Sequence, residues 1–184
     1  HNMTMYKAPS GARVFSAGTI QWAWGLDSEH DGTQSPADPR MQQATLNILA
    51  DLDSFPTTLM PGMVMPTKTT DTVAPTAAIA TPAAGTTIVN GSQVTVTGTA
   101  TDTGGRVAGI EVSTDGATWH PATSGTSSWS YTFIASGAGT MTVRVRAIDD
   151  SANIGTVIAS RSFPLTSSFR PTCAPRSSRR SRPA

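Results

Sequence analysis

The stretch VAGIEVSTDGATWHPA, residues 107–122, decides the fold of the larger part of this 184-residue chain. Ile110 and Val112 alternate with polar residues, which is typical of a half-buried strand. The Asp115-Gly116 pair that follows fits a two-residue type I′ turn, or the start of a slightly longer loop. The stretch therefore predicts a β-hairpin.

The same hairpin carries two acids, a histidine and a tryptophan, so a functional site is the alternative interpretation. Glu111, Asp115 and His120 would be metal ligands or an acid–base set. Strand alternation, however, turns Glu111 to the face opposite the core, and the turn requires Asp115. Trp119 is expected to cover the apolar face of the first strand. We interpret the hairpin as architecture.

Period-two alternation continues on both sides of this hairpin. Turn signals separate about seven short strand-like runs within residues 75–165, which predicts a mainly β chain folded as an immunoglobulin-like β-sandwich. The residues expected to face its core are Val94, Val96, Gly98, Ala100, Ala108, Ile110, Val112, Trp129, Tyr131, Phe133, Met141, Val143, Val145 and Ala147.

Residues 1–54 differ in character and are expected to form a strand–helix stub of an α/β domain. The run ARVFSAGTIQWAW, residues 12–24, has apolar groups on both faces and predicts a buried strand. Asp38 and Pro39 fit the N-cap and the first position of an amphipathic helix of about three to four turns. One strand and one helix do not bury each other fully, so we expect this domain to begin upstream of His1.

Two further segments lack any period. Residues 55–74, which are rich in proline and threonine, predict an extended linker. Residues 166–184 contain no acid and consist mostly of Ser, Pro, Arg and Ala. They fit either a disordered basic tail or the frameshifted end of a reading frame.

Composition argues against several functions. Residues 1–169 carry eight basic and twelve acidic side chains, so nucleic-acid binding is not expected. The single cysteine, Cys173, leaves the preceding residues without a disulfide framework or a cysteine-based metal site. No apolar run approaches the ~20 residues of a membrane span.

Polar side chains gather at strand ends of the predicted sandwich. IDDSANIG, residues 148–155, places Asp149, Asp150 and Asn153 at one strand end, and Asp102 could lie at the same pole. Such a group could bind Ca²⁺ between domains. The alternative is an Asx-type turn.

A second group of donors lies in GLDSEHDG, residues 25–32. Asp27, Glu29, His30 and Asp31 could hold a divalent cation. The alternative is a polar loop, because one loop rarely supplies a whole coordination shell.

No catalytic residue is predicted. Ser10 and Ser16 lack the Gly-x-Ser-x-Gly elbow, and the three histidines are too scattered for an evident triad. Trp22 and Trp24 could stack on a sugar if exposed, but alternating strand positions are more typical of a core.

The hairpin also carries a family resemblance. GIEVSTDGATWHPA, residues 109–122, resembles a hairpin of the immunoglobulin-like domain that follows the molybdopterin domain in sulfite-oxidase-type enzymes. It is similar, too, to related bacterial Ig-like modules of secreted multidomain proteins. The resemblance implies the sandwich fold and a dimer contact, but no molybdenum chemistry.

Residues 1–54 carry a second resemblance, through MTMYKAPSGARVFSAGTIQWAWGLD and ADPRMQQATLNILADL. They resemble the C-terminal end of the N,N-dimethylformamidase large-subunit-like domain, which precedes Ig-like modules in large secreted bacterial proteins. This implies the last strand and helix of an α/β domain. The amidase's iron ligands, tyrosines and a glutamate, match no motif here, so Tyr6 and Glu29 are not assigned.

Two functions remain open. The first is a non-catalytic Ig-like accessory module of a larger secreted bacterial protein, acting as a spacer, a docking surface or a weak binder of carbohydrate or a cell-surface ligand. It would be joined to upstream domains of the same polypeptide and lie outside the cell. The second is the C-terminal part of an enzyme subunit, either an amidohydrolase acting on C–N bonds or the dimerisation domain of a molybdopterin oxidase. The second predicts a homodimer or a tightly bound catalytic polypeptide.

Overall fold

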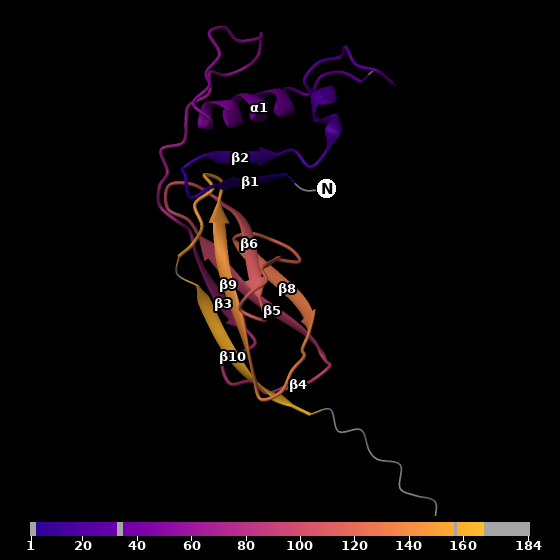
Figure 1. The fold of residues 1–184 in the computed structure, drawn as a ribbon, viewed down its shortest axis with the longest axis vertical. Helices are drawn as coiled ribbons and strands as arrows, with labels where there is room; N and C mark the ends of the chain where they lie inside the picture. Colours follow the sequence, from indigo (N-terminus) through magenta and orange to yellow (C-terminus); the bar gives the residue numbers. More distant parts are fainter. Residues whose placement is uncertain (1–2, 33–34, 157, 168–184) are drawn as a thin grey trace, which may run out of the picture.

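The computed structural model describes residues 3–32, 35–156 and 158–167. It has two parts joined by a long segment without helix or strand (Figure 1). The upper part in this view contains β1, β2 and α1, and the lower part contains β3 to β10. Of the segment expected to be a tail, residues 168–184 lie outside the described residues.

The lower part is a β-sandwich, which confirms the predicted fold class. One sheet has the strand order β4-β10-β9-β6-β7, and the other has the order β3-β5-β8. Only β4 and β10 pair in parallel; the other described pairs are antiparallel. The strands are β3 Thr76–Thr81, β4 Ile88–Val89, β5 Gln93–Thr101, β6 Val107–Ser113, β7 His120–Pro121, β8 Ser128–Ile134, β9 Thr140–Asp149 and β10 Ala159–Thr166.

One apolar core lies between the two sheets, and it follows the predicted alternation. In β9, Met141, Val143 and Val145 are buried while Arg144 between them is exposed. Burying a side chain of this size stabilises the fold by roughly 1.5–3 kcal/mol. The core cluster consists of Ile79, Ile88, Val94, Val96, Ala100, Ile110, Val112, Trp129, Ala135, Met141, Val143, Val145, Ala147 and Phe163.

One predicted core position is wrong. Ala108 is exposed, because the register between β6 and β9 shifts between Val107 and Gly109. A bulge adds one residue to the strand and reverses the faces that precede it. Val107 therefore packs against the core in place of Ala108.

The predicted hairpin is confirmed, with a loop longer than two residues. Val112 of β6 lies opposite His120 of β7, so residues 114–119 form the connection. Asp115 Oδ1 accepts the backbone N–H groups of Ala117 and Thr118, each at 2.8 Å. These bonds hold the pKa of Asp115 well below its usual value.

The expected position of Trp119 is wrong. Its ring lies under the guanidinium of Arg146, with Cζ 4.3 Å from the ring centroid, and Arg146 also pairs with Glu111 at 2.6 Å. Glu111 and Arg146 point away from the core, so Trp119 covers the outer face of the sheet. The cation–π contact with Arg146 stabilises this position of Trp119, and the ion pair with Glu111 holds the guanidinium in place.

The upper part contains a two-stranded antiparallel sheet, a short 3₁₀ helix and one α-helix. Its elements are β1 Thr4–Lys7, β2 Arg13–Ser16, η1 Ile20–Gly25 and α1 Pro39–Asp51. The helix prediction is confirmed: Asp38 is the N-cap, and its Oδ1 accepts the Arg40 N–H at 2.8 Å.

The predicted strand at residues 12–24 is confirmed only as far as Ser16 and is wrong after it. β2 ends at Ser16, and Gly18 follows with φ of 68°, a backbone conformation that interrupts a strand. Thr19 then caps η1, because its Oγ1 accepts the Gln21 N–H at 3.1 Å. Trp22 and Trp24 consequently lie on a 3₁₀ helix and are half-buried.

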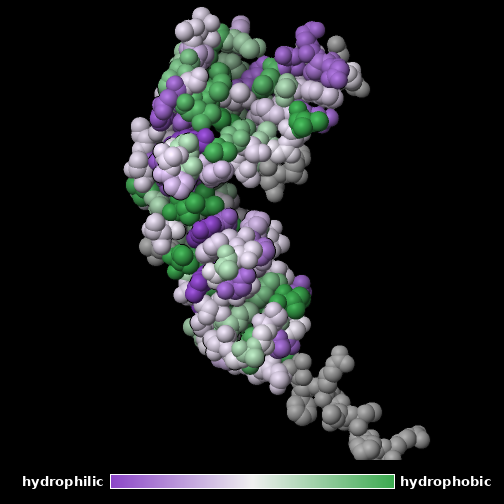
Figure 2. Space-filling model, viewed as in Figure 1, coloured by the Kyte–Doolittle hydropathy of each residue, from purple (hydrophilic) through white to green (hydrophobic). Residues whose placement is uncertain are grey.

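The upper part buries few side chains. Ala50 is fully buried, whereas Ile20 is 98% exposed and Val14 is 40% exposed. Figure 2 shows green, hydrophobic side chains on the surface of this part and near the waist below it. No helix in the described part of the chain is long and apolar enough to cross a bilayer.

Gly98 of β5 gives a direct test of the sandwich packing. A Cβ added there would collide with the carbonyl oxygen of Ala78 and with the buried indole of Trp129. Gly98→Ala is therefore expected to lower the free energy of unfolding by about 1–3 kcal/mol in urea titrations. Gly109→Ala is the control, because nothing lies within 4 Å of its added Cβ. Equal stabilities of the two variants would contradict close packing of β3 and Trp129 against Gly98.

Candidate metal centre

Four aspartates approach one another at the upper pole of the sandwich. Asp71 precedes β3, Asp102 follows β5, and Asp149 and Asp150 lie where β9 ends. One carboxylate oxygen from each of Asp71, Asp102 and Asp149 lies within 4.8 Å of the others. The structure thus brings Asp102 and Asp149 to one pole, as expected, and adds Asp71.

Gly105, in the turn between β5 and β6, lies against this group of carboxylates. A Cβ built there would lie 2.6 Å from Asp71 Oδ2 and 2.7 Å from both Asp102 Oδ2 and Asp150 Oδ1. Carboxylate oxygens of three aspartates therefore converge on the same side of Gly105, where any larger side chain would collide with them. The arrangement also includes Asp150 in the cluster.

Unpartnered buried oxygens are the second feature of the cluster. Both carboxylate oxygens of Asp102 and the Oδ2 of Asp71 are buried, with no hydrogen-bond partner among the described residues. Burial raises the pKa of Asp102, and the charges of Asp71, Asp149 and Asp150 raise it further. A bound cation would supply the compensation that the carboxylates lack.

Asp149 is fixed by the turn that follows β9. Its Oδ1 accepts the N–H groups of Ser151 at 2.9 Å and Asn153 at 2.7 Å, and the residue is only 2% exposed. The Asx-type turn is therefore present. It does not exclude a metal site, because a carboxylate offers about four lone-pair positions.

Asn153 links the two sides of the cluster. Its Nδ2 donates to Asp149 Oδ2 at 2.8 Å and to the backbone oxygen of Asp71 at 3.2 Å. The amide nitrogen faces the acids, so Asn153 positions two of them in this structure.

The second predicted donor group forms a polar loop. Asp27 Oδ1 accepts the Glu29 N–H at 2.8 Å, and Asp27, Glu29 and Asp31 are exposed. His30 stacks on Trp24 with ring centroids 4.9 Å apart. Within the described residues these side chains do not gather as a metal-ligand group.

The cluster opens into a hollow of about 710 Å³ between α1, the segment before β3 and the sandwich. Gln43 and Asp51 line it from the helix, and Gly105 and Asp150 line it from the sandwich. Water and a hydrated ion therefore have room to approach the aspartates.

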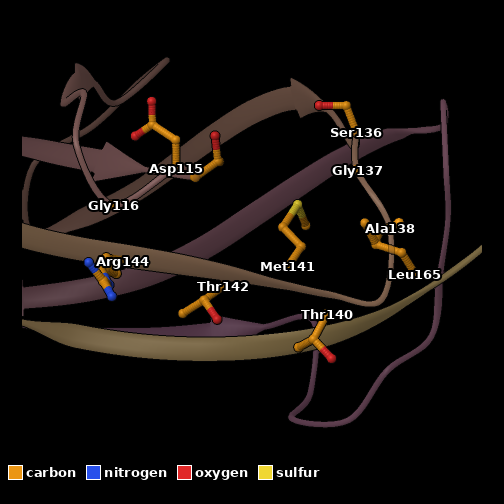
Figure 3. A pocket seen from close by; sticks show the side chains of 11 residues that line it. Asp115, Gly116, Ser136, Gly137, Ala138, Thr140, Met141, Thr142, Arg144 and Leu165 are labelled. Carbon is orange, nitrogen blue, oxygen red and sulfur yellow. The ribbon is translucent and has the colours of Figure 1, made fainter.

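A second hollow, of about 270 Å³, lies beside the hairpin loop. Figure 3 shows Arg144 and Asp115 toward one end of it and Leu165 toward the other. The Oδ1 of Asp115 is already bound within its own loop, so this hollow offers a weaker set of ligands than the aspartate cluster.

Asp71 is the site residue that sequence reasoning missed. It lies in TKTTDTVAP, residues 67–75, where no period indicates which side chains face which way. The available signal was an isolated acid shortly before the first strand of the sandwich.

The fold and this cluster define an immunoglobulin-like β-sandwich module. Its aspartate cluster (Asp71, Asp102, Asp149 and Asp150), hereafter the acidic junction, lies at one pole. Residues 75–157 match the family described as bacterial Ig domain. That match confirms the Ig-like part of the sequence resemblance, and it does not extend to residues 1–54.

Two solved structures show partial likeness to the chain. The fibronectin(III)-like modules of CbhA from Clostridium thermocellum are 18% identical with a TM-score of 0.42, and the match covers 50% of this chain and 98% of that one. CopC from Methylosinus trichosporium OB3b is 13% identical with a TM-score of 0.35, over 52% of this chain and 98% of that one. No curated protein matches the chain.

Asp102→Asn tests the repulsion within the cluster. The pKa of Asp102 is raised in the folded protein from its usual value of 3.8, so its contribution to stability is complete below that pH and is lost as pH rises through the raised value. In EGTA at neutral pH, the variant is expected to melt at a higher temperature than the wild type. The difference should shrink as the pH falls toward the usual pKa. A lower melting temperature for the variant in neutral EGTA would show that the Asp102 carboxylate does not destabilise the metal-free fold.

Proposed function

We propose that this chain is a non-catalytic Ig-like spacer module of a larger secreted bacterial protein, and that Ca²⁺ binds at its acidic junction. The observation that carries the proposal is the convergence of Asp71, Asp102 and Asp150 oxygens around Gly105, with the Asp102 carboxylate buried and unpartnered. Ordinary turn formation accounts for Asp149 and Asn153, but it does not account for Asp102.

The donor set favours calcium among the biological cations. Among the described His, Cys, Asp and Glu side chains, those that gather at the cluster are carboxylates, and such hard ligands suit Ca²⁺ or Mg²⁺ rather than zinc or copper. The oxygens come from three separate segments, the one before β3, the β5–β6 turn and the end of β9. Calcium accepts about six to eight oxygens in irregular geometry, whereas Mg²⁺ demands a near-ideal octahedron.

The extracellular location belongs to the same proposal. Extracellular calcium modules have dissociation constants on the order of 10⁻⁴–10⁻³ M, and a site assembled from turns and an exposed segment fits that range. The match of residues 75–157 to a bacterial Ig domain supports an accessory role.

The hairpin histidine supports the non-catalytic part. Glu111 pairs with Arg146 at 2.6 Å, and Asp115, the nearest acid in the sequence, is bound within its turn. His120 is exposed and stacks near Tyr131, with centroids 6.5 Å apart. The acids of the hairpin are thus engaged elsewhere, which favours architecture over acid–base chemistry.

We assign residues 1–54 to the end of a dimethylformamidase large-subunit-like domain that lies upstream in the same polypeptide. The support is the sequence resemblance together with the poor burial of this part, in which Ile20 is 98% exposed. The proposed roles of the sandwich are spacing and docking, including weak contact with carbohydrate or another cell-surface ligand.

Calcium is expected to stabilise the wild-type protein. At free Ca²⁺ about 100-fold above the dissociation constant, the gain is about 2.7 kcal/mol, seen as a rise in melting temperature over EGTA. Asp102→Ala and Gly105→Ala should lose this rise, and isothermal titration should show no binding to either.

Glu29→Gln is the matched control for the second predicted donor group and should keep the full response. A wild-type melt unchanged by millimolar Ca²⁺ would refute the calcium site. Loss of the response in Glu29→Gln alone would move the site to the loop of residues 27–31.

Light scattering distinguishes the spacer from the oxidase-type alternative. A spacer is expected to remain a monomer with and without Ca²⁺, because its contacts are with its own polypeptide. A stable dimer would instead favour the dimerisation domain of a molybdopterin oxidase.

A further inference from the structure

Residues 64–73, here called the strap, are held by α1 on one side. Gln43 forms two hydrogen bonds with Val64: its Nε2 donates to the backbone oxygen at 3.0 Å, and its Oε1 accepts the N–H at 2.8 Å. The Thr69 N–H donates to Asp51 Oδ1 at 2.8 Å. These bonds attach the strap along the helix.

The same strap is held by the sandwich on its other side. The hydroxyls of Thr69 and Ser151 lie 2.7 Å apart, and Asn153 Nδ2 donates to the backbone oxygen of Asp71. Asp71 is also the one aspartate of the cluster that belongs to the strap. Its Oδ1 accepts the Val73 N–H at 2.9 Å, while its Oδ2 faces Gly105.

We propose that Ca²⁺ at the cluster fixes the strap and thereby couples α1 to the sandwich. The inference rests on the proposed calcium site. The coupling also acts in the opposite direction. The contacts between α1 and the strap strengthen calcium binding, because two linked equilibria change each other by the same factor.

Electrostatics gives the coupling its direction. Without a cation, Asp71 lies among like charges, and repulsion from Asp102, Asp149 and Asp150 favours movement of the strap away from the sandwich. A bound cation reverses the sign of that interaction. Among the described residues, a side-chain hydrogen bond from Arg13 Nη1 to the Ser151 oxygen at 2.7 Å joins the two parts directly. The strap connects α1 to the cluster.

Gln43→Ala, studied in the full chain, tests the coupling away from the metal ligands. The variant removes both bonds to Val64 and no charge, so it is expected to weaken Ca²⁺ binding about two- to tenfold in isothermal titration. Gln42→Ala is the matched control. Gln42 lies on the same helix, but its Nε2 donates to the Leu26 oxygen at 2.7 Å and does not contact the strap. Its affinity should equal that of the wild type.

Amide hydrogen exchange measured by NMR provides the second readout. Saturating Ca²⁺ is expected to slow exchange of the Val64 and Thr69 N–H groups at least about tenfold in the wild type. Asp71→Ala should lose this slowing even when the Ca²⁺ concentration is high enough to saturate the site formed by the other three aspartates.

The outcomes separate the two proposals. Calcium binding with unchanged exchange at Val64 and Thr69, or with equal affinities in Gln43→Ala and Gln42→Ala, would overturn the coupling and leave the calcium site intact. Absence of calcium binding by the wild type would overturn both.

Discussion

Antiparallel strand pairing is the constraint that places the acids of this chain together. Thr76 of β3 lies opposite Thr101 of β5, and Val107 of β6 lies opposite Asp149 of β9. The segment before β3, the turn after β5 and the end of β9 therefore meet at one pole of the sandwich. The apolar core between the sheets fixes this register, because a shift of one residue would turn its buried side chains outward. The acidic junction is thus a consequence of how the core packs.

The same constraint explains which site residues the sequence could predict. Asp102, Asp149 and Asp150 lie at the ends of strands with clear period-two alternation, so their common pole could be anticipated. Asp71 lies in a segment without alternation, and its place depends on the bond from Asn153 to its backbone oxygen. Such a contact joins residues 82 positions apart in sequence and leaves no local pattern.

The errors within the sandwich and before it have equally local causes. Period-two alternation predicts the faces of β6 but not the bulge that turns Ala108 outward. It also predicts a strand wherever apolar residues alternate, although in the run at residues 12–24 the strand ends at Ser16, and Gly18 and the Thr19 cap begin a 3₁₀ helix. The α1 prediction succeeded because its signal, the Asp38 N-cap followed by proline, is a specific interaction within the segment itself.

Clustered carboxylates make a junction conditional in a way that an apolar interface is not. Apolar packing would hold the two parts together at any calcium concentration, because the hydrophobic effect does not depend on a specific ion. Carboxylates that repel one another oppose attachment of the strap to the sandwich until a cation is present. The free energy of cation binding then stabilises the state in which the strap is attached. For the proposed secreted spacer, this means that the strap is mobile where Ca²⁺ is scarce, as during synthesis. Outside the cell, bound Ca²⁺ would fix the strap to the sandwich. Asp102 is the residue that makes this distinction, since its unpartnered carboxylate opposes the metal-free fold and would bind the ion that relieves it.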